Sequence, residues 1–158
     1  QAARRGTSIH KMAERYILNE ENIYDKEMPV NIESFKPIKE ILDKHVDNIF
    51  GIELPLYNRG LKCAGRTDLV AEFDGTLSII DFKTAKEHKL EAHIQDYFQQ
   101  GAAYALMYEE LVGKHIDQIV IMISPNNGDD PQVFVRQKDE YVEPLLEKIH
   151  GFHTAVMS

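Results

Sequence analysis

Residues 65–84 read GRTDLVAEFDGTLSIIDFKT, and most of what the sequence predicts begins from this stretch. The Asp74-Gly75 dipeptide lies between two runs rich in apolar residues, which is a strong signal for a two-residue β-hairpin turn. Asp68 and Asp81 each lie six residues from the nearer turn residue, so that turn would make them cross-strand neighbours on one face. Alternate side chains of a strand share a face, so Lys83 points the same way as Asp81. The stretch therefore predicts two carboxylates and an ammonium group at one place.

Such a group of charges favours a divalent-metal site. Adjacent carboxylates repel each other unless a cation lies between them. Mg²⁺ prefers oxygen ligands, often one or two carboxylates together with waters and substrate phosphate. The plain alternative is a surface ion pair between Asp81 and Lys83. The predicted strand 76–83 is apolar on both faces, however, and charges are rarely placed in such a strand without a function. We therefore favour the metal site, with Lys83 positioning or deprotonating the attacking water.

The remaining sequence predicts a mixed α/β sheet with helices on both faces. A Ser34 cap, with Pro37 in the first turn, is expected to start the second helix after a loop over 19–31. Gly113 is expected to end the third helix. Apolar periodicity predicts helices at 2–18, 34–49, 90–112 and 139–156, and strands at 51–57, 61–73, 76–83, 115–124 and 132–136. The third strand is expected to be central in the sheet.

Length and composition indicate one globular domain over residues 1–158. The chain has 43% apolar and 28% charged residues, and its longest apolar run is far shorter than the ~20 residues that span a bilayer. Cys63, the single cysteine, is interpreted as a small core or strand residue, and it favours a reducing, intracellular compartment. The net charge of −8 argues mildly against nucleic-acid binding, although a metal site contributes carboxylates to that count. The chain starts at Gln1 without a methionine, so we expect a truncation or processing boundary there.

Five short motifs, in order, resemble the RecB-type branch of the PD-(D/E)XK nucleases. Residues 5–10, RGTSIH, are similar to the helix that delivers a metal-binding histidine, and residues 51–56, GIELPL, to the first core strand with an acid at Glu53. Residues 65–70 and 80–84 resemble the two acidic motifs, and residues 100–104, QGAAY, resemble the Q-x-x-x-Y motif. Asp81 stands where much of the superfamily has Glu, a variant that occurs in this branch. Within the branch, the chain looks most like phage exonucleases and the mitochondrial genome maintenance exonuclease.

The resemblance implies a restriction-endonuclease-like fold and a metal-dependent deoxyribonuclease. Mg²⁺ or Mn²⁺ would be held by His10, Asp68, Asp81 and the backbone carbonyl of Phe82, and Lys83 would orient the nucleophile. The expected reaction is phosphodiester hydrolysis by an exonuclease that acts on single-stranded DNA or DNA with a free end. The expected location is the cytoplasm or the mitochondrion, or the host cytoplasm for a phage protein.

Each residue transferred from the family also has a simpler interpretation. His10 could only pack against the sheet. Glu53, the further catalytic candidate, could ligate the metal directly, support a ligand through a hydrogen bond, or simply pair with Arg66 or Lys83. Amide and phenol groups one helical turn apart suit a phosphate backbone but could also cap core polar groups. These two groups belong to Gln100 and Tyr104. Three further residues are candidates for substrate binding: Tyr97 could stack on a base or only pack, Arg66 could bind phosphate or Glu53, and Thr84 could donate to the backbone or to phosphate.

Two other classes of function compete with a free-standing enzyme. A non-catalytic nucleic-acid-binding module could keep the fold, but it would be expected to have lost Asp81 or Lys83, and both are present. A nuclease subunit of a helicase–nuclease or another replication, recombination or repair complex is also compatible with the sequence. The chain has no P-loop motif and therefore no motor of its own.

Overall fold

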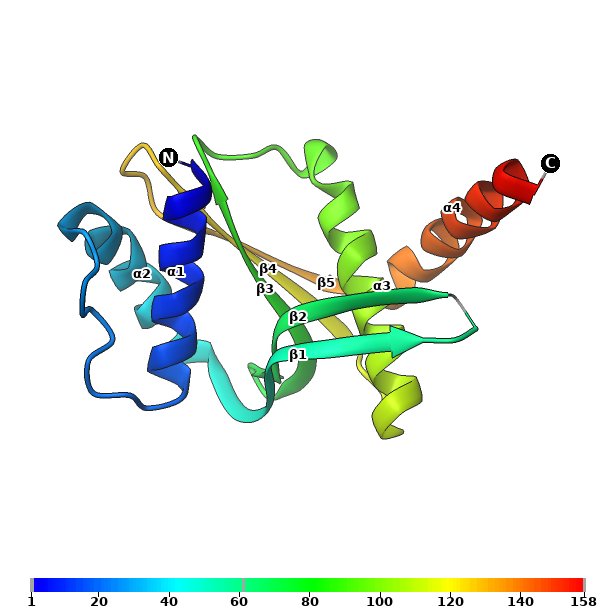
Figure 1. Cartoon of the computed structure of the whole chain (residues 1–158), viewed down its shortest axis with the longest axis horizontal. Helices are drawn as coiled ribbons and strands as arrows, with labels where there is room; N and C mark the ends of the chain where they lie inside the picture. The colour runs from blue at the N-terminus through cyan, green and yellow to red at the C-terminus, as the bar shows by residue number, and fades with distance from the viewer. Residues whose placement is uncertain (1, 61, 158) are drawn as a thin grey trace.

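The computed structural model describes residues 2–60 and 62–157, which form a five-stranded sheet with helices on both faces. Figure 1 shows α1 and α2 on one side of the sheet and α3 and α4 on the other. The elements are α1 (Ala2–Ile17), α2 (Pro29–His45), β1 (Val46–Asn58), β2 (Cys63–Phe73), β3 (Thr76–Ala85), a 3₁₀ turn (Glu91–His93), α3 (Gln95–Val112), β4 (Gln118–Pro125), β5 (Gln132–Gln137) and α4 (Asp139–Met157).

The sheet is mixed, and its strands follow the order of the chain. The spatial order is β1-β2-β3-β4-β5, with β3 and β4 parallel and the other neighbouring pairs antiparallel. The parallel pair is joined by a crossover through α3, as parallel strands require. The predicted mixed α/β sheet and the central position of β3 are confirmed.

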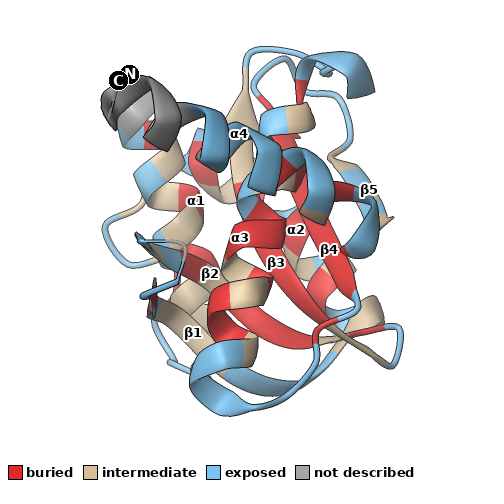
Figure 2. Ribbon diagram, turned by 90° about the vertical axis from the view of Figure 1, so that its right-hand side faces the viewer, coloured by how far each residue is buried: buried red, intermediate tan, exposed pale blue. Residues whose placement is uncertain are grey.

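Two apolar layers hold the sheet between its helices, and the buried strands β3 and β4 lie between these layers (Figure 2). Ile79 on β3 packs in the layer of α3, whereas Ile80 and Phe82 pack in the layer of α1 and α2. This alternation confirms that Phe82 points away from the face of its odd-numbered neighbours. A strand buried on both faces explains why the sequence of β3 shows a nearly continuous apolar run.

The β2–β3 hairpin forms as predicted. Asp74 and Gly75 have φ values of 51° and 82°, the positive values that a two-residue type I′ turn needs at both positions. The pairing runs from Phe73–Thr76 to Leu69–Ile80. Continued by one residue, this register places Asp68 opposite Asp81.

The prediction for the second helix and first strand was wrong at both boundaries. Helix α2 begins at Pro29, whose missing N–H costs nothing in a first turn, and Pro37 lies inside the helix. The helix ends at His45, and β1 takes over at Val46 because Val46 pairs with Phe73 of β2. The apolar residues up to Ile49 therefore belong to a strand.

Three further boundaries differ from the predicted ones. The helix expected from residue 90 begins at Gln95, after the 3₁₀ turn. The strand expected from residue 115 begins at Gln118, which pairs with Gln137 of β5, and His115 lies between the carboxylates of Glu109 and Asp117. The expected start of β2, Leu61, lies outside the described residues. Gly113 does end α3, with φ 78°.

Candidate active site

Three carboxylates from three adjacent strands lie at one level of the sheet. In β1, the neighbours of Glu53 pair with the neighbours of Asp68, so Glu53 faces Asp68 across the β1–β2 ladder. Asp68 in turn faces Asp81 across the extended register of β2 and β3. Glu53 has a φ of 46°, a left-handed conformation that is uncommon for a residue other than glycine. The regular ladder is therefore interrupted on both sides of Asp68.

Carboxylate groups replace the missing backbone pairing between β2 and β3. The amide N–H of Phe82 donates to Oδ2 of Asp68 over 2.8 Å, and the amide N–H of Asp68 donates to Oδ1 of Asp81 over 3.2 Å. These two charge-assisted bonds satisfy backbone donors that would otherwise be left over at the end of the hairpin. They also hold the two carboxyl groups next to each other, as the hairpin register predicts.

His10 reaches the same point from α1. Its Nδ1 lies 2.7 Å from the carbonyl oxygen of Gly6, an acceptor, so Nδ1 carries a proton and Nε2 is directed at Oδ2 of Asp68, 3.1 Å away. Burial alone would lower the pKa of His10, but the hydrogen bond and charge of Asp68 outweigh it and raise that pKa to about 9. Metal-binding histidines commonly donate one ring N–H to a backbone carbonyl or a carboxylate and ligate the metal through the other nitrogen, and Nδ1 of His10 has such a carbonyl partner.

Asp81 is the most buried charged group of this cluster, with 2% of its surface exposed. Burial, and after it the negative charge of Asp68, raises the pKa of Asp81 to about 7. Its Oδ2 is shielded from solvent and has no hydrogen-bond partner among the described residues. A buried, unpartnered carboxylate oxygen is costly unless a cation or proton satisfies it.

The side chains fit a divalent ion in their chemistry, although they do not yet enclose one. No group of three or more His, Cys, Asp or Glu side chains within residues 2–60 and 62–157 is arranged so that it could hold a metal ion. Nε2 of His10 and Oδ2 of Asp68 hydrogen-bond each other, and Oδ2 of Asp81 lacks a partner. The two carboxylates suit Mg²⁺ or Mn²⁺. The imidazole of His10 would add one nitrogen ligand. The carbonyl of Phe82 as a further ligand stays a prediction.

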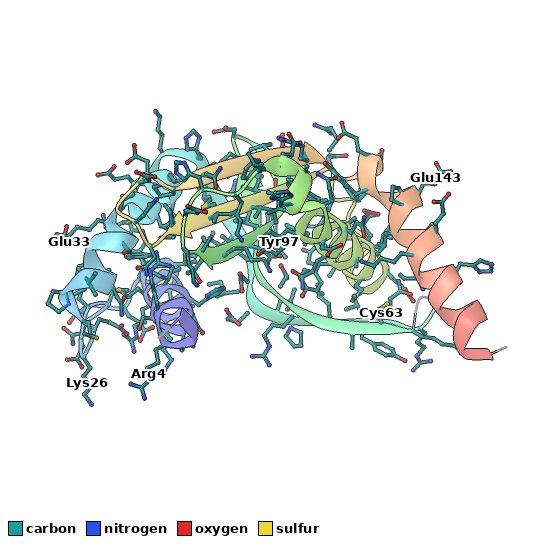
Figure 3. The ribbon with its side chains drawn as sticks, turned by 90° about the horizontal axis from the view of Figure 1, so that it is seen from above. Arg4, Lys26, Glu33, Cys63, Tyr97 and Glu143 are labelled. Atoms are coloured by element: carbon teal, nitrogen blue, oxygen red, sulfur yellow. The ribbon has the colours of Figure 1, made fainter. Side chains whose placement is uncertain are left out.

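Lys83 is held by α3 rather than by the acids. Its Nζ donates to Oε1 of Gln100 over 2.8 Å and lies 4.8 Å from the ring centre of Tyr97. Tyr97 is labelled on α3 in Figure 3. No ion pair joins Lys83 to a carboxylate in the described part of the chain. Lys83 follows Asp81 by two residues on β3, so the two share a face, and its charge opposes the rise in the pKa of Asp81 that burial causes.

Tyr104 packs on the strand that carries Asp68. A Cβ on Gly65 would lie 2.6 Å from the Tyr104 ring, so only glycine fits beneath it. Burial raises the pKa of the Tyr104 phenol, and the charges of Asp81 and then Asp68 add to that rise. Gly101 on α3 is likewise at a position without room for a side chain, because a Cβ there would lie 2.5 Å from Ile119 of β4. The two glycines let α3 approach the sheet closely enough to place Gln100 and Tyr104 beside the acids.

An open pocket of about 460 Å³ lies in front of the cluster. His10, Glu53 and Asp68 line it, and so does Thr84, a predicted substrate contact. Burial raises the pKa of Glu53, and the negative charges of Asp68 and Glu14 add to this rise. Arg66 is exposed, and its charge acts on Glu53 in the opposite direction.

Four residues of this pocket, Gly6, Thr7, Lys11 and Glu14, were absent from the predicted site. Glu14 lies one helical turn after His10, so the i, i+4 spacing on α1 was the available signal for it. Thr7 and Lys11, on the same helix, complete the rim. Nothing in the sequence alone shows that this face of α1 lies over β2 and β3.

The N-terminal half of α1 is fixed to the sheet by a buried arginine. Arg5 is 8% exposed, and its Nη2 donates to the carbonyl oxygens of Ser124 and Pro125 and to Oγ of Ser124, at 2.8–3.1 Å. Gly6, the next residue, packs against Thr84, since a Cβ there would lie 3.3 Å from Oγ1. These contacts set the position of α1 along β3 and β4, and with it the position of His10.

Comparisons with known proteins identify the family of the chain and its fold. The sequence profile of the PD-(D/E)XK nuclease superfamily matches residues 10–151. The crystal structure of a candidate exonuclease from Eubacterium rectale superposes with a TM-score of 0.60 and 12% sequence identity. The superposition covers 97% of this chain and 66% of that one, so the chain spans just under two thirds of that protein, and the likeness at this identity concerns the fold. No curated protein matches the chain.

The matched family region contains every residue of the carboxylate cluster and the histidine beside it. It also contains the five-stranded sheet and the flanking helices from the middle of α1 to most of α4. A match over that much of the chain shows the family. The protein belongs to the PD-(D/E)XK nuclease superfamily.

Proposed function

We propose that the protein is a divalent-metal-dependent deoxyribonuclease that hydrolyses phosphodiester bonds in single-stranded DNA or near a free DNA end. The observation that carries the proposal is the pairing of Asp68 with Asp81 at the open end of the hairpin. One carboxylate there accepts the Phe82 amide, and the other keeps a buried oxygen without a partner among the described residues. The nuclease family supports the hydrolytic chemistry. Exonuclease action and the choice of single strands are the finer parts of the proposal.

The metal would be held by Asp68, Asp81 and His10. When bound, a divalent ion would stabilise charge on the phosphorus oxygens and acidify water. The chain itself must then align the strand and the water. Lys83 is suited to that task, because its Nζ carries three donors and is held near the acids by Gln100 and Tyr97. The amine can donate a hydrogen bond to the attacking water or, once deprotonated, accept its proton.

The substrate contacts would come mainly from α3 and from the start of α1. Gln100 is exposed beside Lys83, so its amide N–H groups can donate to a phosphate oxygen. Thr84 and Lys11 line the open pocket from the other side. Tyr104 is held over Gly65 and therefore supports the strand of Asp68.

None of the helices in the described ranges has the length and apolar character needed to cross a bilayer.

Digestion of end-labelled DNA tests the proposal. Wild-type protein is incubated with single-stranded and double-stranded oligonucleotides carrying either a 5′ or a 3′ label, in Mg²⁺, Mn²⁺ or EDTA. We expect metal-dependent shortening of the single strand from an end, no cutting in EDTA and none by Asp81→Asn. Asp130→Asn, an exposed loop aspartate, is the matched control and should cut normally. Cutting in EDTA, or equal cutting by Asp81→Asn, would contradict the proposal, and metal-dependent cutting confined to duplex interiors would remove its exonuclease part.

A further inference from the structure

A second groove lies on the far side of Gln100 from the carboxylate cluster. It is enclosed by α3, α4 and the turn between β1 and β2, and its volume of about 450 Å³ is in the range of small-molecule sites. Figure 3 shows Cys63, at the start of β2, on the side of the molecule near α4. We name this the α3–α4 groove, and its lining includes Cys63, Gln99, Ala103, Leu145, Lys148 and Ile149.

The floor of the α3–α4 groove is apolar, and its rim is cationic. Ala103 and Leu145 belong to the buried core, and Cys63 and Ile149 pack against that core. Lys62 and Lys148 stand exposed at the rim of a chain whose net charge is −8. An apolar floor can pack against the face of a base, and the ammonium groups of the rim can neutralise the phosphates next to it.

One carboxylate also lies at this rim. Asp96 pairs with Lys148 over 3.1 Å, and both side chains are mostly exposed, at 82% and 62%. An exposed ion pair is weak, so a phosphate oxygen can take the place of the carboxylate on Lys148. Asp96 therefore reduces the positive charge of the rim without closing the groove.

Gln99 and Gln100 connect the α3–α4 groove with the candidate active site. Gln100 lines the groove and also accepts the hydrogen bond from Nζ of Lys83. Oε1 of Gln99 is shielded from solvent and has no hydrogen-bond partner among the described residues. Rotation of this amide toward the groove would give that oxygen a donor from a base N–H group, and unmade buried hydrogen bonds are costly.

We propose that the α3–α4 groove binds one unpaired nucleobase of the DNA strand whose backbone passes Lys83. This inference rests on the proposed nuclease function and deepens it. A base paired in a duplex cannot enter the groove without being unstacked, so the groove would select single-stranded DNA. The protein would thus recognise an unpaired base, and Lys62 and Lys148 would contact the phosphates on either side of it.

Alkylation of Cys63 provides a readout that does not depend on cleavage. Cys63 is the single cysteine of the chain and lines the groove, so its rate of reaction with N-ethylmaleimide reports occupancy. The rate is measured in EDTA, so that no strand is cut, with a single-stranded oligonucleotide, an abasic oligonucleotide of equal length, and a duplex. We expect about tenfold protection by the base-bearing single strand and little by the other two. Equal protection by the abasic strand, or no protection by any strand, would overturn the proposal.

Cleavage kinetics of a charge-reversal variant give the second arm. Lys148→Glu should raise KM for single-stranded DNA about tenfold and leave kcat unchanged, because Lys148 pairs with Asp96 rather than with a residue of the carboxylate cluster and a phosphate contact acts on affinity. Lys44→Glu, an exposed lysine of α2 on the opposite face, carries the same charge change and should leave KM unchanged. An unchanged KM in Lys148→Glu would count against the groove while leaving the nuclease proposal intact. If single strands protect Cys63 but no metal-dependent cleavage is observed, binding of the strand in the groove is supported and the nuclease proposal is contradicted.

Discussion

The two halves of the β2–β3 hairpin are built in different ways. In the half next to the turn, from Phe73–Thr76 to Leu69–Ile80, backbone groups pair with one another and most of the apolar side chains are buried in the core. In the half beyond it, Asp68 and Asp81 accept the backbone N–H groups instead, and one buried carboxylate oxygen is left without a partner among the described residues. The two arrangements are adjacent in one continuous hairpin, because Asp68 and Asp81 directly follow the last backbone pair, Leu69–Ile80.

The difference shows how stability and chemistry are divided along a single strand. Ile79 and Ile80 are fully buried, one in each apolar layer, and they anchor β3 from both sides. Asp81, the next residue, holds a charge at a place where burial opposes it. The packed half provides the rigidity that keeps the unfavourable charge in place, so substitutions in the two halves should have opposite effects on stability and activity.

The largest effect is expected from Asp81→Asn. Removal of the carboxylate that faces Asp68 should lower kcat at least about a thousandfold, since the group acts on charge that develops in the transition state. Thermal stability without metal should be equal to or higher than that of the wild type, because a neutral amide avoids burying a charge. Cleavage assays and calorimetry of the same preparation measure both values, with Asp130→Asn as the control. If Asp81→Asn lost thermal stability as well as activity, the account in which one half of the hairpin provides stability and the other provides chemistry would be contradicted.

The packed half should respond in the opposite way. Ile80→Ala leaves a cavity between β3 and the α1–α2 layer and should lower the free energy of unfolding by about 2–5 kcal/mol. At a temperature where the variant is folded, its kcat should fall far less than that of Asp81→Asn, because the Ile80 side chain enters the α1–α2 layer, on the face opposite to Asp81. Denaturant unfolding and cleavage at low temperature test the pair of expectations. A stable variant with a strongly reduced kcat would show that the two halves are not separable.

A smaller effect is expected from the residue that holds Lys83. Gln100→Ala removes the acceptor of the Nζ hydrogen bond and should lower kcat about tenfold, as removal of a supporting partner commonly does. Gln95→Ala, on the first turn of the same helix, removes an amide whose Nε2 donates to Glu91 and should leave kcat unchanged. Steady-state kinetics of the two variants decide the matter. Equal kcat values would mean that Lys83 is positioned by other groups.

The smallest expected effect is a pH dependence of stability without metal. The pKa of Asp81 is raised from 3.8 to about 7 and that of His10 from 6.5 to about 9. A raised folded-state pKa gives stability that is complete below the unfolded value and lost as pH rises through the folded one. The Tm in EDTA should therefore fall between about pH 4 and 7 through Asp81, and between about pH 6.5 and 9 through His10.

Added Mg²⁺ should reverse this trend, since the ion replaces the protons on its ligands. Calorimetry from pH 5 to 9.5, with and without Mg²⁺, measures both curves. Asp81→Asn should retain only the decline that His10 causes. A Tm that rises with pH in EDTA would contradict these assignments.

The β2–β3 pairing could be predicted from the sequence because a two-residue turn sets the register of every later pair. Asp74-Gly75 supplies the positive φ values, so the position of Asp68 opposite Asp81 follows by counting. The central position of β3 was likewise visible in its apolar run. Local signals of this kind depend on neighbouring residues alone.

The positions of Glu53 and Lys83 depend on distant contacts and could be predicted only in part. The register of β1 shifts near Asn48 and Phe50, and these irregularities bring Glu53 opposite Asp68. The sequence contains no sign of two such shifts. Lys83 turns toward Gln100 because Gly101 lets α3 approach Ile119, a contact between elements far apart in the chain. Glu14 enters the pocket only through the packing of α1 on the sheet.

The most direct test of the metal site at the open end of the hairpin is a crystal grown with Mn²⁺ and measured at a wavelength where manganese scatters anomalously. We expect one strong anomalous peak between the carboxylates of Asp68 and Asp81, with ligand distances of about 2.1 Å and the imidazole of His10 as a further ligand. His10 and Asp68 would then no longer hydrogen-bond each other directly. A fully occupied peak elsewhere, or no peak with Asp81 still lacking a partner, would contradict the proposed site.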